Sequence, residues 1–248
     1  MKRMILAGLL ALAPCFAMVA DAAPTDPDAP KFCTKWLVSL DAAGRVTAIE
    51  PTDGTLVEAA RVPLERAIRE WRFVSGRVNG VPAPTQTILT LDIALVPADD
   101  DRFHVRIDDA RTGGDLAIKG MRKPPRYPAD AIQHRWQGMV VLKVDYDTDG
   151  RVVASGQAAG APTVAMSLVR SAEKAVKEWG FTPEVVGGHA LAGSAFISVC
   201  FNIVAPGTRP NNDCAWTPPG AKSALRETDA FALAPATRLE TDVVGHTL

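Results

Sequence analysis

The sequence lacks a surplus of either charge. Its 27 Lys and Arg residues nearly balance its 28 Asp and Glu residues, and the formal net charge at pH 7 is −1. Proteins that bind nucleic acid carry a basic patch that neutralises phosphates. Because no basic run or basic surplus is present, the sequence predicts no nucleic-acid partner.

Sets of residues that perform chemistry are also missing. The four histidines His104, His134, His189 and His246 are scattered and show no metal-ligand spacing such as HExxH. A G-x-S-x-G nucleophile elbow is absent. We therefore expect a protein that is not an enzyme, with no cofactor, no bound metal and no small-molecule substrate.

Long apolar runs are absent except at the N-terminus. Lys2 and Arg3 precede an apolar stretch, Met4–Ala20, and a small-x-small pattern follows at Ala20–Ala22. The stretch is shorter than the roughly 20 residues of a spanning helix, so residues 1–23 are predicted to be a cleaved secretory signal. An uncleaved inner-membrane anchor is the alternative. Export would place the chain in an oxidising compartment.

Cysteine is scarce, with four residues in the chain. Loss of the signal would remove Cys15 and leave Cys33, Cys200 and Cys214. The last two bracket a short loop rich in Pro, Asn and Gly, and we predict that they form a disulfide with Cys33 unpaired. The alternative is three reduced, buried thiols.

Tryptophan is equally rare, yet two of the five residues occur in matching frames. The stretches AIREWRF (Ala67–Phe73) and AVKEWGF (Ala175–Phe181) each end a segment with apolar residues at i, i+3, i+4 and i+7. This spacing predicts an amphipathic helix whose last turn places its Trp on a sheet. The predicted core residues are Trp71, Phe73, Trp179 and Phe181.

The segments around each heptapeptide also match, which indicates an internal duplication of a strand–strand–helix–strand unit. The paired segments are Lys35–Ile49 with Met139–Gly156, and Thr85–Leu95 with Gly193–Val204. The predicted organisation is a first copy (residues 31–96), a linker (97–122), a second copy (123–205) and a tail without a clear period (206–248).

Ordered motifs of the second copy resemble the C-terminal domain of TonB-type energy transducers. The motifs are Pro125-x-Tyr127-Pro128, Gly138-x-Val140-Val141, Asp149-Gly150-x-Val152 and the helix end Ala175-Val176-x-x-Trp179-x-Phe181. The resemblance covers Lys123–Val204, and Lys35–Leu95 is similar as a degenerate copy without the Tyr-Pro helix. It implies an α+β fold of two tandem small domains, each a three-stranded antiparallel sheet packed against one or two helices.

The same resemblance implies a periplasmic, non-catalytic binding module in a Gram-negative envelope, linked to TonB-dependent transport across the outer membrane. In this family the domain captures an extended segment of an outer-membrane receptor, which adds as a strand beside the final strand. Another envelope protein is an equivalent partner class. The partner-binding residues implied here are Tyr127, Pro128, Ser194, Ser198, Cys200 and Asn202.

Two alternatives remain open. One is a membrane-anchored energy transducer with an uncleaved N-terminus, although Met4–Ala20 has no His and the spacer Ala23–Pro30 is short. The other is a structural envelope scaffold whose two sheet edges, Thr85–Leu95 and Ser194–Val204, pair with each other. Pairing of two copies as a homodimer is also left open.

Overall fold

The computed structural model of this chain describes most residues from Ala29 onward. Among them, no helix is long and apolar enough to cross a membrane. The predicted signal, residues 1–23, lies outside the described residues. The described residues are 29–52, 56, 58–98, 103–117, 123–204, 214–219, 221, 223–225 and 229–248.

The first half of the chain is a sheet with a helix on one face. Its main elements are β1 (Lys31–Leu40), β2 (Val46–Pro51), α1 (Glu58–Glu70) and β6 (Thr85–Pro97). β1 lies between β2 and β6 and is antiparallel to both. Side chains alternate along a strand, so Trp36 and Val38 point into the same core, which α1 fills with Leu64 and Ile68.

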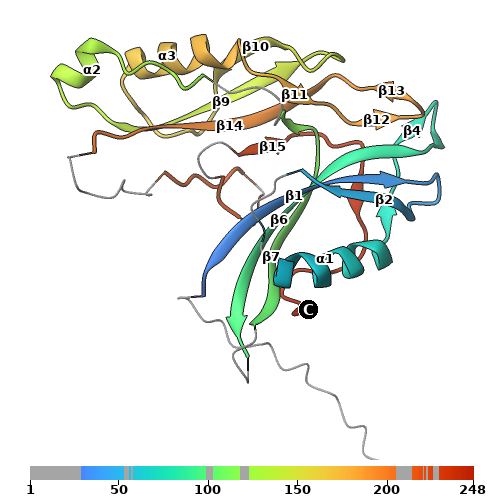
Figure 1. Cartoon of the computed structure of the whole chain (residues 1–248). Coiled ribbons are helices and arrows are strands. Elements are labelled where there is room, and N and C mark those ends of the chain that lie inside the picture. Colours follow the sequence, from blue (N-terminus) through green and yellow to red (C-terminus); the bar gives the residue numbers. More distant parts are fainter. Residues whose placement is uncertain are drawn as a thin grey trace, which may run out of the picture.

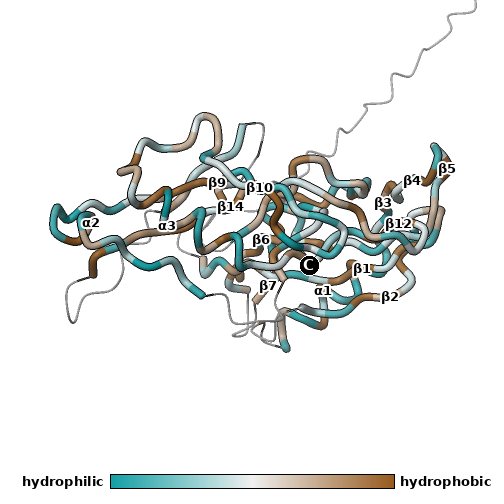
Figure 2. The backbone as a smooth tube through the Cα atoms, turned by 90° about the horizontal axis from the view of Figure 1, so that it is seen from above, coloured by the Kyte–Doolittle hydropathy of each residue, from teal (hydrophilic) through white to brown (hydrophobic). Residues whose placement is uncertain are grey.

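The second half repeats this arrangement. Its elements are α2 (Ala129–Gln133), β9 (Gly138–Tyr146), β10 (Val152–Gln157), α3 (Met166–Val176) and β14 (Gly193–Phe201). β9 lies between β10 and β14, and α3 buries Leu168 and Val176 against their sheet. Figure 1 shows α3 lying along the sheet of β9 and β14, and α1 against the sheet of the first half. Apolar residues recur along the central strands of both sheets (Figure 2).

The repetition extends to single hydrogen bonds. The Gly44 carbonyl accepts the amide of Phe73 at 3.0 Å, and the Gly150 carbonyl accepts the amide of Phe181 at 2.8 Å. Both glycines have φ of 75°, and a Cβ on either would collide with the carbonyl oxygen of that Phe. Positive φ and close backbone approach both require glycine. Each hairpin turn therefore fixes the strand that follows the helix.

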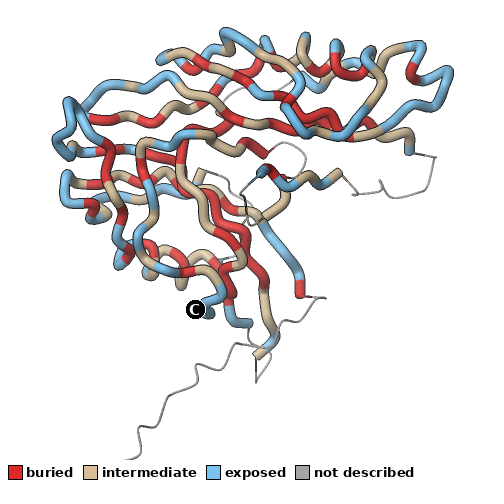
Figure 3. Tube along the Cα trace, turned by 180° about the vertical axis from the view of Figure 1, so that it is seen from behind, coloured by how far each residue is buried: buried red, intermediate tan, exposed pale blue. Residues whose placement is uncertain are grey.

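The aromatic residues of the twin heptapeptides lie in the two cores. Trp71 and Trp179 are each 6% exposed, Phe73 is 2% and Phe181 is 4% exposed. Figure 3 shows the buried residues concentrated along the central strands. The helical periodicity therefore predicted correctly that these side chains face the core.

Short strands follow each helix in matching order. They are β3 (Phe73–Val74), β4 (Arg77–Val78) and β5 (Val81–Pro82) in the first half, and β11 (Phe181–Thr182), β12 (Val185–Val186) and β13 (His189–Ala190) in the second. Asn79-Gly80 and Gly187-Gly188 form the two-residue hairpin turns, all with positive φ. Such turns suit the right-handed twist of the paired strands.

The expected linker, residues 97–122, is instead largely sheet. β7 (Phe103–Gly113) pairs antiparallel with β6, from Ile88 opposite Gly113 to Pro97 opposite Phe103. Val105 and Ile107 enter the first core. Charged residues alternate with these two apolar residues along the strand. Those charges lie on the opposite face, where ion pairs and hydrogen bonds compensate them.

The expected tail, residues 206–248, also contributes strands. β15 (Ala230–Ala232) pairs with β14, and β16 (Arg238–Leu239) pairs with β3. Further on, the amide of Leu248 donates to the carbonyl of Val105 at 2.8 Å, and Val243 is buried in the first core. Strands of two or three residues are too short to show a period, and they form because partner strands supply the pairing.

The two halves are interlocked. β8 (Asp115–Leu116), which follows the first half, pairs with β11 of the second, and β16, which follows the second half, pairs with β3 of the first. β12 also pairs with β6. The sheets consequently have six and four strands in place of the expected three each. The α+β class is as expected. β7 and β15 come from the segments expected as linker and tail, while β12 and β13 of the second half extend the sheet of the first.

Candidate partner-binding edge

β14 is the strand along which three of the six predicted binding residues lie. One side pairs with β9, from Gly193 opposite Tyr146 to Phe201 opposite Gly138. Alternate side chains such as Ile197 face the core under α3. The other side of β14 is therefore the edge that a partner strand would use.

That edge is partly covered by the chain's own tail. β15 pairs antiparallel with Ala195–Ile197, and the amide of Leu233 donates to the carbonyl of Ser194 at 2.9 Å. Beyond Ile197, no strand within the described part of the chain pairs with this side of β14. The expectation of an available edge along Ser194–Val204 is therefore wrong for its first residues, because β15 already uses their backbone groups.

Ser198 does not face solvent as the alternation of the strand suggested. It is 1% exposed and lies opposite Val141 in the β9 ladder. A third apolar cluster covers this face of the second sheet, and tail residues complete it. Its buried members are Met139, Val141, Ala158 and Leu225, with Phe196, Trp216 and Phe231 packed against them. Because the tail returns over the sheet, the outer face of β14 is an interior surface.

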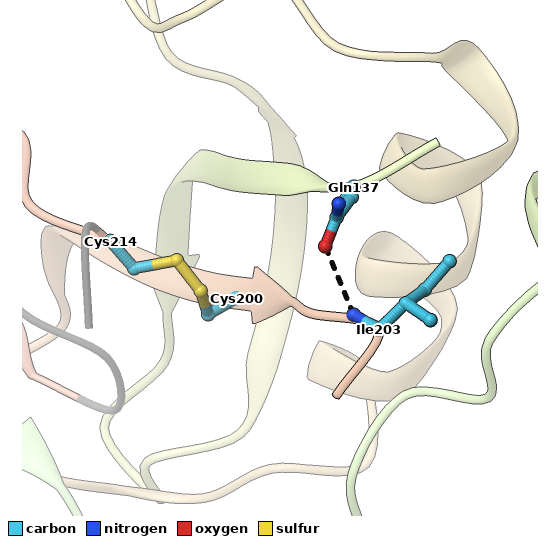
Figure 4. Close-up of a disulfide and its surroundings, with 4 residues drawn as sticks. All are labelled: Gln137, Cys200, Ile203 and Cys214. Carbon is cyan, nitrogen blue, oxygen red and sulfur yellow. Dashed lines mark hydrogen bonds between the residues drawn. A yellow bond between two sulfur atoms is a disulfide. The ribbon is translucent and has the colours of Figure 1, made fainter. Parts of the chain in front are cut away.

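A disulfide ties the tail to the end of β14. Cys200 and Cys214 are bonded, as the sequence predicts, with their Cα atoms 6.0 Å apart (Figure 4). Just past the strand, the Gln137 side-chain oxygen accepts the amide of Ile203 at 3.1 Å. Asn202, also predicted to bind a partner, is half-buried between these anchors. The covalent link brings the tail back toward β14.

The Tyr-Pro segment packs beside the same end of β14. The half-buried Tyr127 ring meets the Phe201 ring edge to face with centroids 5.4 Å apart, and its hydroxyl donates to the Trp136 carbonyl. Burial raises the pKa of Tyr127. Pro128 precedes α2, and its carbonyl accepts the amide of Ile132 at 3.0 Å. This segment thus supports the strand end.

The six predicted binding residues form a line and not a single point. Ser194 begins the edge, where its hydroxyl donates to the Asp145 carboxylate. Seven residue steps at about 3.3 Å each separate it from Phe201, which Tyr127 contacts. Such a line suits an extended segment better than a compact ligand. Within the described residues no group of His, Cys, Asp and Glu is arranged to hold a metal ion.

A charged network between the halves was missed by sequence reasoning. Arg111 lies 3.4 Å from Asp92 and 3.3 Å from Asp109 and donates to the Ser223 hydroxyl at 2.6 Å. These side chains come from β6, β7 and the tail. Alternation of charged with apolar residues along β7 was the available signal. The network compensates charges that the tail covers.

A second ion pair lies beside it. Lys35 on β1 contacts Asp115 on β8 at 2.6 Å. Burial acts to lower the pKa of Lys35, but the charge and hydrogen bond of Asp115, with smaller contributions from Asp229 and Cys33, together outweigh burial and raise the pKa. The ion pair connects the first sheet to β8, the short strand that pairs with β11 of the second half.

Cys33 is expected to resist alkylation while the protein is folded. Burial, with smaller contributions from the Asp229 and Asp92 carboxylates, raises the pKa of this free thiol from 9.0 to about 12. The thiolate is the reactive form, so at pH 8 iodoacetamide should modify the Cys33 peptide much faster in urea than in buffer. Mass spectrometry measures the two rates, and equal rates would contradict the prediction.

The same shift predicts a pH dependence of stability. A folded-state pKa above the unfolded value means that the stabilising contribution is complete below pH 9 and is lost progressively as pH rises toward 12. Replacing Cys33 by Ser should reduce this alkaline loss.

Comparison with known proteins finds a similarity in the second half. The family model described as the Gram-negative bacterial TonB protein C-terminal matches residues 123–203. Two proteins named "Protein TonB", from strains B100 and ATCC 33913 of Xanthomonas campestris pv. campestris, are each 33% identical over 107 residues. The match covers 43% of this chain and 47% of each relative, so the chain spans about half the length of the curated relatives it matches. No solved structure matches the chain.

The fold of this region defines a class of small α+β domains, in which a helix covers one face of an antiparallel sheet and the last strand lies toward one edge. Within that class, residues 123–203 match the family model described as the Gram-negative bacterial TonB protein C-terminal and are similar to the two TonB proteins.

Proposed function

We propose that the chain is a TonB-like, non-catalytic binding module of the periplasm, linked to TonB-dependent transport across the outer membrane. It captures an extended segment of an outer-membrane receptor, or of another envelope protein, by strand addition at β14. Residues 123–205 form the binding copy, and residues 31–96 form a degenerate copy. The supporting observation is the position of β14, which pairs with β9 along its whole length on one side and with the short β15 at Ala195–Ile197 on the other.

The register of the ladder identifies the backbone groups that a captured strand would use. Paired residues of an antiparallel ladder alternate between bonded and non-bonded pairs. The bond from Leu233 to Ser194 places Ser194 and every second residue after it with their amide and carbonyl toward the edge. Phe196, Ser198 and Cys200 share that direction. An exposed edge of this kind captures extended peptides through main-chain bonds.

Strand addition predicts that a proline at Ser198 reduces capture of the receptor. Proline removes the edge-facing donor while leaving the bonds to β9, and the loss of one net hydrogen bond corresponds to about tenfold in affinity. The measurement is affinity capture from envelope extract with quantitative mass spectrometry of outer-membrane receptors.

The matched control is Ser198→Ala, which removes the hydroxyl but keeps the amide donor. It should capture as the unchanged chain does. Both variants are first checked for a cooperative unfolding transition. Equal capture by a folded Ser198→Pro variant would rule out strand addition at this edge.

A structural envelope scaffold is the second candidate, and the internal pairing of the edges favours it. β6 pairs with β1 on one side and with β7 and β12 on the other, while β14 pairs with β15. Thr85–Leu95 does not pair with Ser194–Val204, so the edges are covered by other strands than this hypothesis expected. A chain that captures no receptor in any variant supports the scaffold.

The third candidate, a membrane-anchored transducer, depends on residues 1–23. Mass spectrometry of the mature N-terminus decides it, because a chain beginning at Ala23 or Pro24 has no anchor.

A further inference from the structure

β15 occupies the same backbone groups that a captured peptide would use. It runs antiparallel to β14 with Ala195 opposite Ala232 and Phe196 opposite Phe231. The bond from the amide of Leu233 to the carbonyl of Ser194 makes Phe196 and Phe231 the next bonded pair in the alternation. The tail therefore forms the contact that strand addition requires, within one chain.

The pairing of β15 with this edge is short. Three residues of β15 pair with β14, two of them alanines, and the Leu233 amide adds one further bond to Ser194. Ala230 enters the core under α3, while Phe231 points to the other face, beside Phe196 and Trp216. A segment with two small side chains and one aromatic anchor is suited to reversible docking, because few apolar contacts hold it in place.

Space lies next to β15 on the side of the first half. A cavity of about 290 Å³ is bounded by the tail and by the end of β7, with Gly113, Gly114 and Ala232 in its lining. A Cβ on Gly113 would collide with the Cβ of Ala232, so the tail passes close to this glycine. The cavity therefore adjoins β15 on the side of the first half, although Ala232 itself packs closely against Gly113.

Contacts on both sides of β15 hold the tail in position. Before β15, the Cys200–Cys214 disulfide and the fully buried Leu225 hold the tail on the second sheet. After it, the Glu184 carboxylate accepts the amide of Ala236 at 2.6 Å, and β16 pairs with β3 of the first half. The degenerate first half therefore holds the far end of the tail.

We infer that β15 is an intramolecular cap on the partner-binding edge, that the first half retains it, and that an extended partner binds by displacing it. This inference rests on the proposed function of β14. It gives the first half a role that its missing Tyr-Pro helix does not suggest, namely regulating access to the second half.

The test uses the whole chain and a peptide taken from it. The probe is a fluorescent synthetic peptide copying residues 228–234, and its binding is followed by anisotropy. Phe231→Pro removes the bonded donor of β15, and Phe231→Leu is the matched control that keeps both donor and apolar character. In a locked variant, Ala195 and Ala232 are both replaced by cysteine, because directly opposed non-bonded residues lie close enough for a disulfide. The single Ala232→Cys variant is its control.

If the cap is closed in the unchanged chain, only its small open fraction binds the probe. Phe231→Pro should then bind at least about tenfold more tightly than the unchanged chain and Phe231→Leu, and the locked variant should not bind detectably. Equal binding by Phe231→Pro and the unchanged chain overturns the inference, as does full binding by the locked variant.

Receptor capture separates this inference from the proposed function. If Phe231→Pro binds the probe but captures no outer-membrane receptor, the cap exists and the proposed function fails. If all variants capture receptor equally and the probe distinguishes none of them, the function stands and the cap is wrong.

Discussion

Deleting residues 238–248 should abolish the stable fold of the first half. The deletion removes β16 from β3 and removes Leu239, Val243 and Leu248 from the first core. Fully burying a Val side chain such as Val243 contributes about 1.5–3 kcal/mol, and the half-buried Leu239 and Leu248 add smaller amounts, against the roughly 5–15 kcal/mol by which domains are stable. The last strand of the chain is thus part of the core of its first half.

Hydrogen exchange measures this effect by region. Amides of α1 and β1 should lose protection in the truncated chain, and urea unfolding should lose its single cooperative transition. The control is His246→Ala, whose exposed side chain should change stability by less than about 0.5 kcal/mol. Unchanged protection of α1 would show that the tail adds nothing to the first core.

Replacing Trp71 or Trp179 by Ala should each cost about 3–5 kcal/mol of unfolding free energy. Each indole is 6% exposed and lies at the end of a helix packed on its sheet. The indole N–H of Trp179 also donates to the Lys123 carbonyl at 3.1 Å, so Trp179→Phe should lose about 1 kcal/mol as well. Urea titration measures these changes.

The matched control is Trp136→Ala. This indole is 43% exposed and stacks on the His134 ring with centroids 4.7 Å apart. Its replacement should cost far less than that of the two buried tryptophans. A Trp71→Ala variant as stable as Trp136→Ala would contradict the view that both heptapeptides perform the same packing role.

The local sequence pattern was sufficient to predict the strand–strand–helix–strand unit that occurs in both halves. The Asp-turn glycines, the Trp-x-Phe ends of the helices and the alternation along β1 and β9 each record a requirement of neighbouring residues, and the structure shows all of them. The Cys200–Cys214 pairing could also be predicted, because a short loop limits the choice.

The local sequence pattern did not predict the strands that pair with segments distant in the sequence. β7 carries Arg106, Asp108, Asp109 and Arg111, and these residues do not reveal that the segment pairs with β6 along its length. The exposure of Ser198 was misjudged for a related reason: alternation tells which face of β14 a side chain occupies, but not that the tail covers that face.

By itself the sequence determined the unit of this protein: two hairpins, each fixed by a glycine turn and each covered by a helix ending in tryptophan. These features depend on residues a few positions apart, so periodicity and turn chemistry reveal them. Only the tertiary structure decided that the units are interlocked and that β15 pairs with the edge of β14. Strands as short as β8, β15 and β16 have no preference of their own, and these three form where a segment distant in the sequence supplies the pairing.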